Sequence, residues 1–232
     1  MGDDRVNGHR KAVCLCSGGL DSTVSTTIAK EEGHDLYILH LNYGHRAENK
    51  EIEAVISIAS QLDAREVKFV DLSFLKELGG SSLTDFSVPV PVHEEVKPGE
   101  TPSTWVPCRN LVFLSLASSY AEVIKADFIF TGFNAEEAQS YPDNTEVFSE
   151  KFNEVLREAV ASFTKPPLVK APLVKMFKSD IMRKAVEVKA PIELTWSCYL
   201  DYEKHCGKCE ACRHRSRGFI EANIEDPTEY MG

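Results

Sequence analysis

The stretch KAVCLCSGGLDSTVS, residues 11–25, joins a short apolar run to a loop of glycines, hydroxyl groups and one acid. Ala12–Cys16 has the composition of a buried strand, and Thr23–Lys30 is expected to be a helix that stops near Gly33. Such a loop suits phosphate, because glycines let backbone N–H groups approach an anion and the following helix dipole attracts it. Neither commoner nucleotide loop, Gly-x-x-x-x-Gly-Lys-Ser/Thr or Gly-x-Gly-x-x-Gly, is present here.

The rest of the chain continues the alternation of strands and helices. Further strands are expected at 35–44, 66–72, 127–132 and 167–174. Further helices are expected at 47–62, 109–126, 145–163 and 178–188. Strand–helix–strand units form right-handed crossovers between parallel strands. The pattern therefore predicts a doubly wound α/β domain of about five parallel strands. Such sheets bind ligands beyond the carboxyl ends of their strands, where residues 17–22 lie.

Composition restricts the class of partner. The 232 residues are 43% hydrophobic and carry a formal net charge of -10. The acidic balance disfavours direct binding of nucleic acid and favours small-molecule partners. The chain has no apolar run of about 18 residues and its first residues are polar, so we expect a cytoplasmic protein without a membrane partner.

Two segments depart from the alternating pattern. Residues 79–108 are rich in Gly, Pro, Ser and Thr, and a loop of this length is usually functional or disordered. We expect it to form a flap beside the site, with a tolerated surface insertion as the alternative. The chain is expected to divide into a main domain, residues 1–195, and a small C-terminal segment, residues 196–232.

The C-terminal segment contains four closely spaced cysteines, Cys198, Cys206, Cys209 and Cys212. In a reducing compartment this spacing favours a metal over disulfides, and four thiolates suit a tetrahedral, structural Zn²⁺ site. His205 and His214 are possible substitutes for one thiolate. The same thiols could instead hold an iron–sulfur cluster or carry persulfide sulfur, and free thiols clustered by chance are the remaining alternative.

Ser-Gly-Gly-Leu-Asp-Ser resembles the signature of the PP-loop, or N-type ATP pyrophosphatase, superfamily. The later blocks VPCRNLVFLSLA, PIELTWSCY and CGKCEACRHRSRGFIEANIEDPTEY resemble the QueC family within it, over nearly the whole chain. The resemblance implies an adenine nucleotide alpha hydrolase-like fold and an ATP-dependent ligase. That ligase converts 7-carboxy-7-deazaguanine and ammonia to 7-cyano-7-deazaguanine through adenylated intermediates, in queuosine or archaeosine biosynthesis.

The resemblance also assigns roles to residues. Those implied to bind ATP are Ser17, Gly18, Gly19, Leu20, Asp21 and Ser22, with Asp21 helping to hold Mg²⁺. Those implied to be catalytic are Asp21, Ser22, Arg46, Arg109 and Lys178. Those implied to bind the substrate are Arg109, Asn110, Asn134, Tyr141 and Asp143. The four cysteines are implied to bind zinc, and a homodimer is plausible.

Some residues depart from the family pattern. Cys108 stands where Gly or Ala is frequent, His45 stands where Gln is common, and the loop after the fourth strand lacks the usual Asp-Tyr-Ser. The alternative function is therefore another PP-loop enzyme that adenylates a related acceptor, such as a tRNA thiolase or a QueC-like defence-system enzyme. A zinc-binding interaction module without catalysis is a third hypothesis.

Overall fold

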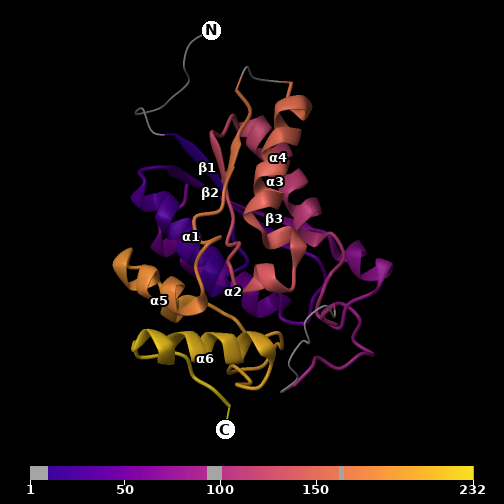
Figure 1. Ribbon diagram of the computed structural model, residues 1–232, viewed down its shortest axis with the longest axis vertical. Coiled ribbons are helices and arrows are strands. Elements are labelled where there is room, and N and C mark those ends of the chain that lie inside the picture. The colour runs from indigo at the N-terminus through magenta and orange to yellow at the C-terminus, as the bar shows by residue number, and fades with distance from the viewer. Residues whose placement is uncertain (1–9, 93–100, 162–164, 232) are drawn as a thin grey trace.

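A computed structural model describes residues 10–92, 101–161 and 165–231 and contains one sheet of five parallel strands in the order β3-β2-β1-β4-β5 (Figure 1). The strands are β1 (Lys11–Leu15), β2 (Asp35–Asn42), β3 (Glu66–Asp71), β4 (Phe128–Phe130) and β5 (Leu168–Lys170). Cys14 of the central strand pairs with Ile38 on one side and with Phe130 on the other. The predicted parallel α/β sheet is confirmed.

Six α-helices connect and follow the strands in the described residues. They are α1 (Leu20–Glu31), α2 (Glu48–Gln61), α3 (Arg109–Ile124), α4 (Glu146–Ala159), α5 (Lys178–Glu187) and α6 (Glu210–Ala222). Helix α1 begins inside the Gly-Gly motif, three residues before the expected start, and α4 ends at Ala159. The expected end of α4 at residue 163 lies outside the described residues. No helix of the described chain combines the length and the apolar character needed to cross a bilayer.

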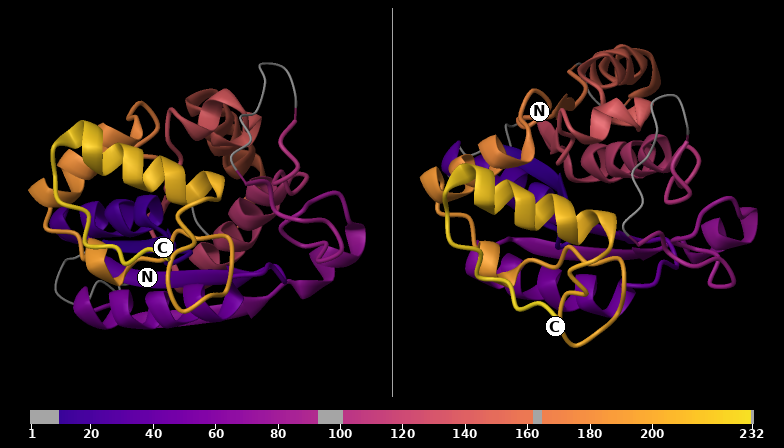
Figure 2. Two further views of the ribbon diagram at one scale, coloured as in Figure 1. Left: turned by 90° about the horizontal axis from the view of Figure 1, so that it is seen from below. Right: turned by 60° about the horizontal axis from the view of Figure 1, so that its bottom comes forward.

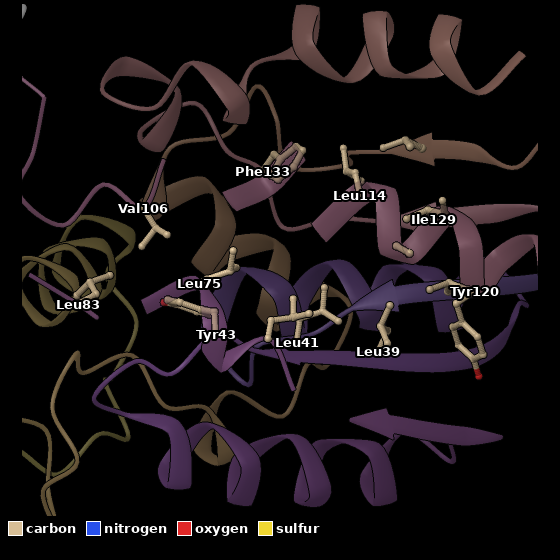
Figure 3. Close-up of a cluster of buried hydrophobic side chains, with 14 of the residues drawn as sticks. Leu39, Leu41, Tyr43, Leu75, Leu83, Val106, Leu114, Tyr120, Ile129 and Phe133 are labelled. Carbon is tan, nitrogen blue, oxygen red and sulfur yellow. The ribbon is translucent and has the colours of Figure 1, made fainter. Parts of the chain in front are cut away.

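The helices cover the two faces of the sheet separately. Successive strand side chains point to opposite faces, so Val13 joins one buried cluster and Cys14 another. The first cluster places Leu39 and Ile129 of the sheet against Leu114 of α3 (Figure 3), and residues of α4 also belong to it. On the opposite face α1 and α2 pack on the sheet, and α5 packs on α1.

Helix α6 was not predicted. Its buried residues are Cys212, Arg215, Gly218 and Phe219, and this face lacks the repeated aliphatic residues that indicate an amphipathic helix. The helix runs beside α5 (Figure 2). A Cβ added to Gly218 would lie 2.9 Å from the Cβ of Lys178, so the glycine lets α6 approach the beginning of α5.

The structure describes residues 79–92 and 101–108 of the expected flap. Residues 93–100 lie outside the described chain. Its two limbs are joined where Ser82 N donates to Ser103 O at 2.8 Å. Farther along, Val92 forms an antiparallel bridge with Cys209. The segment therefore connects the region after β3 with the C-terminal cysteines.

The carboxyl end of β4 lies directly against the beginning of α1. A Cβ added to Gly132 would lie 2.7 Å from Ser22 N and 3.0 Å from the carbonyl carbon of Asp21. Both are backbone atoms, which cannot move aside as the end of a flexible side chain can. Glycine at this position therefore allows the Gly-Gly motif to lie beside the loop that follows β4.

We predict that Gly132→Ala lowers the free energy of unfolding by about 1–3 kcal/mol, because the added methyl group overpacks a backbone contact. For a chain of this size the melting temperature should fall by about 2–4 °C per kcal/mol. Val123→Ala, at an α3 position that is 79% exposed, is the control and should stay within about 0.5 kcal/mol. Equal melting temperatures for Gly132→Ala and the parent would contradict the contact.

Candidate active site

A cavity of about 270 Å³ opens at the carboxyl ends of β1, β2 and β4, where parallel sheets bind ligands. Its walls come from elements far apart in the sequence. The Gly-Gly motif, the start of α3 and the loop after β4 supply part of the lining. The flap and the C-terminal segment also contribute to the lining, through Leu83, Thr104, Trp105, Val106, Trp196, Ser197, Tyr199 and Ala211.

The Gly-Gly motif has the geometry of an anion loop. Ser17 Oγ lies 3.2 Å from Ser22 Oγ, and both residues line the cavity. The N-cap of α1 is Gly19, which offers no capping side chain, so the first N–H groups of the helix stay available to a ligand. Gly18 has φ +79° and does not line the cavity; an added Cβ there would lie 2.8 Å from Glu51 O of α2.

The buried Lys178 and the partly buried Asp21 form an ion pair beside this loop. Lys178 Nζ donates to Asp21 Oδ2 at 2.6 Å and lies 3.7 Å from Glu137 Oε1. Burial lowers the pKa of Lys178, but the carboxylates of Asp21 and Glu137 outweigh burial and raise it above its ordinary value. Asp21 Oδ1 is buried and has no hydrogen-bond partner in the described chain. A free carboxylate oxygen in this position fits a hard cation such as Mg²⁺.

Glu137 lines the same cavity and was missed in the sequence analysis. Asn134 Oδ1 accepts hydrogen bonds from Glu136 N at 3.1 Å and Glu137 N at 2.9 Å, which fixes the loop after β4. Burial raises the pKa of Glu137, because it outweighs the attraction of Lys178. The sequence signal that could have identified Glu137 is its position in the loop that follows the fourth predicted strand. Parallel sheets bind their ligands at such loops.

The beginning of α3 places Arg109 and Asn110 in the cavity lining. Arg109 Nη1 donates to Tyr43 OH at 3.2 Å, and its guanidinium carbon lies 5.3 Å from the centre of the Tyr43 ring. Cys108, just before the helix, has φ +54°, a conformation that glycine adopts more readily.

Asp143 was expected to face the substrate, yet it does not line the cavity. Its carboxylate accepts from Asn110 N at 3.2 Å and from Asn110 Nδ2 at 3.1 Å. The first N–H groups of a helix need acceptors, and Asp143 provides one for α3. The structure therefore brings Asp143 to Asn110 rather than into the cavity.

Arg46 likewise does not line the cavity. Its guanidinium donates to the carbonyl oxygens of Ser82 at 3.1 Å, Asp85 at 3.0 Å and Val88 at 2.7 Å. The guanidinium carbon also lies 4.7 Å from the centre of the Phe86 ring. The side chain thus anchors residues 82–88 of the flap.

Aromatic residues form another part of the cavity wall. Tyr141 stacks on Trp105 with ring centres 5.7 Å apart, and its hydroxyl group lies 2.9 Å from Thr104 Oγ1. Trp105 and Tyr199 also line the cavity but were not among the expected site residues. The signal for Trp105 was a large aromatic side chain within a Pro-rich segment.

The four cysteines of the C-terminal segment converge. The sulfur atoms of Cys198, Cys206, Cys209 and Cys212 all lie within 4.8 Å of one another and are buried. Four sulfurs at about 2.3 Å from a tetrahedral ion would be about 3.8 Å apart, so the cluster can bind a metal. His205 and His214 are not part of it: His205 Nε2 accepts from Ser197 N at 3.0 Å, and His214 Nδ1 lies 3.3 Å from Glu136 Oε1.

We predict that Glu137→Gln stabilises the protein at neutral pH. A carboxyl group with a raised pKa destabilises the fold only where it ionises, that is above the ordinary Glu pKa of about 4.3. The gain in free energy of unfolding should therefore grow as pH rises from about 4 toward neutrality. Urea denaturation over this pH range measures it, with Glu146→Gln in an exposed ion pair as the control. A less stable Glu137→Gln variant at neutral pH would contradict the prediction.

Comparison with known proteins identifies relatives over nearly the whole chain. The family model described as "Queuosine biosynthesis protein QueC" matches residues 11–223. The 7-cyano-7-deazaguanine synthase of Methanothrix thermoacetophila is 54% identical over 223 residues, 95% of this chain and 99% of the relative. That of Methanosphaerula palustris is 43% identical over 220 residues, again 95% of this chain and 99% of the relative.

Among solved structures, the U34-tRNA thiolase NcsA from Methanococcus maripaludis is similar at 19% sequence identity and a TM-score of 0.49. The similarity covers 96% of this chain and 67% of that chain. Since the QueC model spans the sheet, the Gly-Gly motif and the cysteine cluster, the chain belongs to the QueC family.

Proposed function

We propose that the protein is an ATP-dependent ligase that converts 7-carboxy-7-deazaguanine and ammonia to 7-cyano-7-deazaguanine. The observation that carries this proposal is the 54% identity, over 95% of the chain, to a protein named as that synthase. The site is consistent with it, because an anion loop and a buried lysine lie at one cavity. The enzyme would act in queuosine or archaeosine biosynthesis and would not bind nucleic acid directly.

The Gly-Gly motif is proposed to hold the phosphates of ATP. The N–H groups at the start of α1 and the hydroxyl groups of Ser17 and Ser22 would donate to phosphate oxygens. Mg²⁺ at Asp21 Oδ1 would neutralise phosphate charge when bound. Lys178, fixed by its ion pair with Asp21, would stabilise charge that develops on the reacting phosphate.

The first chemical step overcomes the poor reactivity of a carboxylate toward ammonia. A carboxylate oxygen of the substrate attacks the α-phosphorus of ATP, and pyrophosphate leaves with the electron pair of the broken P–O bond. Ammonia then displaces AMP and gives the amide. A second adenylation, on the amide oxygen, allows AMP to leave again and the nitrile to form.

The acceptor is proposed to bind between the start of α3 and the loop after β4. Arg109 uses only Nη1 for Tyr43, so the rest of its guanidinium can hold the substrate carboxylate. Asn110, Asn134 and Tyr141 would contact the deazapurine. Asp143 and Arg46 are proposed to act as positioning residues, through Asn110 and the flap respectively.

We predict that Asp21→Asn and Lys178→Met each lower the turnover number by about 10²-fold or more. Asp21→Asn weakens the proposed Mg²⁺ site, and Lys178→Met removes the positive charge proposed to stabilise the reacting phosphate. Lys175→Met is the matched control, since Lys175 is a lysine in an exposed ion pair on the same segment. Mass spectrometry of AMP and nitrile, with melting curves to confirm folding, measures the effect. Full activity in folded Asp21→Asn would contradict the ATP site.

The same assay tests the whole proposal. 7-Carboxy-7-deazaguanine, ammonium, Mg²⁺ and ATP should give nitrile together with AMP. AMP without nitrile would support adenylation at the Gly-Gly motif and would contradict the proposed acceptor. If the wild-type protein consumes no ATP, the enzyme proposal fails.

The cysteine cluster is proposed to hold structural Zn²⁺. Four thiolates leave the ion no open position, and metal bound to the folded state adds to its stability.

We predict that Cys209→Ser loses the metal and melts at a lower temperature. Cys108→Ser, at an exposed cysteine outside the cluster, should keep the metal and the parent melting temperature. Metal analysis by plasma mass spectrometry checks this. Iron with acid-labile sulfide in the purified protein would contradict zinc.

A further inference from the structure

Three carboxylates surround Lys178, and they differ in how fully they are paired. Asp21 accepts from Lys178 Nζ at 2.6 Å, so its charge is largely balanced. Glu136 contacts Arg217 and His214 and lies 3.4 Å from Lys178 N. The Glu137 carboxylate accepts no hydrogen bond from any described residue, and Lys178 Nζ, at 3.7 Å, is its ion-pair contact. Since the unpartnered Asp21 Oδ1 is proposed to bind Mg²⁺, Glu137 is the carboxylate left with acceptor capacity for another ligand.

Glu137 also occupies the junction between the two ends of the proposed site. Lys178 and Asp21 lie on the side of the Gly-Gly motif, where the phosphates are proposed to bind. Asn134 and Tyr141, proposed to contact the deazapurine, precede and follow Glu137 on its own loop. The backbone N–H of Glu137 donates to Asn134 Oδ1 at 2.9 Å. This hydrogen bond fixes the backbone from which the carboxylate extends. The bond between acyl group and AMP would form in this region.

The chemistry at this junction needs a proton acceptor. Near neutral pH the amine donor is almost entirely ammonium, which has no lone pair and cannot attack an acyl group. We propose that Glu137 is the catalytic base that takes a proton from ammonium in the cavity. The inference rests on the proposed function, since it names the acceptor for a step of that reaction.

The proton and electron balance is complete without any further reagent. Ammonium gives one proton to the Glu137 carboxylate and becomes ammonia. The nitrogen lone pair forms the C–N bond, the C–O bond to AMP breaks, and AMP leaves with its electron pair. The second proton, on the attached nitrogen, passes to water and leaves the neutral amide, and Glu137 returns its own proton to solvent.

The environment of Glu137 suits this role. The groups that act on it are Lys178 of α5, Asp21 of α1, Arg109 of α3 and Glu136 of its own loop. Tyr141, Tyr199 and Glu210 also interact with it electrostatically. Burial raises the pKa of the carboxyl group toward the working pH, where a general base is most efficient.

The test separates adenylation from amine attack. Exchange of labelled pyrophosphate into ATP, with 7-carboxy-7-deazaguanine present, reports adenylation alone. Mass spectrometry reports the product of attack by ammonium or by hydroxylamine, which is largely unprotonated near neutral pH and needs no base to free its lone pair. Wild type, Glu137→Gln, Glu137→Asp and the exposed control Glu146→Gln are compared.

We expect Glu137→Gln to keep pyrophosphate exchange and hydroxamate formation while product from ammonium falls by about 10²–10⁴-fold. Glu137→Asp should recover part of the ammonium reaction, and Glu146→Gln should match wild type. Unchanged ammonium turnover in Glu137→Gln would overturn the inference. So would an equal loss with both nucleophiles, or an equal loss of exchange, because Glu137 would then serve binding or adenylation. Absence of exchange in the wild type would instead overturn the proposed function, and this inference with it.

Discussion

The contact between Lys178 and Asp21 holds the candidate site together. It joins the first turn of α5 to the first turn of α1, two helices whose strands are separated in the sheet. Lys178 is buried and the Asp21 side chain is partly buried, so removing Asp21 would leave the lysine charge with only its 3.7 Å contact to Glu137 and would destabilise the fold. Two glycines make the arrangement possible: Gly132 admits the loop after β4 beside α1, and Gly218 admits α6 beside Lys178. The motif, the loop and the C-terminal helix therefore meet at one ion pair.

The cysteine cluster lies close to this site, because its sequence neighbours line the cavity. Tyr199 follows Cys198 and lines the cavity, while Ala211 precedes Cys212 and lines it too. The flap contacts the cluster through the bridge between Val92 and Cys209. A metal in the cluster would thus support two walls of the cavity at once, although a closed set of four thiolates gives it no part in the chemistry.

The sequence was sufficient to predict the sheet, and each predicted strand occurs. Apolar runs and helical periodicity are local signals that can be recognised without tertiary contacts. It was also sufficient for the Gly-Gly motif and the convergence of the four cysteines. Helix α6 escaped prediction because Arg215 and Gly218 replace the aliphatic residues of an ordinary buried face. Asp143 and Arg46 lie outside the cavity, contrary to expectation, because tertiary contacts decide their partners. Asp143 binds the N-terminus of α3, and Arg46 binds three carbonyl oxygens of the flap. For Glu137 the sequence offered only its position in the loop after β4, because its proximity to Lys178 is set by tertiary contacts.

We propose that transfer of AMP activates the substrate carboxylate, at a loop that holds ATP next to the acceptor. The most direct measurement uses 7-carboxy-7-deazaguanine with ¹⁸O in both carboxylate oxygens, followed by mass spectrometry of every product. If each oxygen leaves bound to the α-phosphorus, each AMP released will carry one ¹⁸O and pyrophosphate will carry none. Unlabelled AMP, or label in pyrophosphate or inorganic phosphate, would show activation at another phosphorus or none, and would rule out activation by AMP transfer.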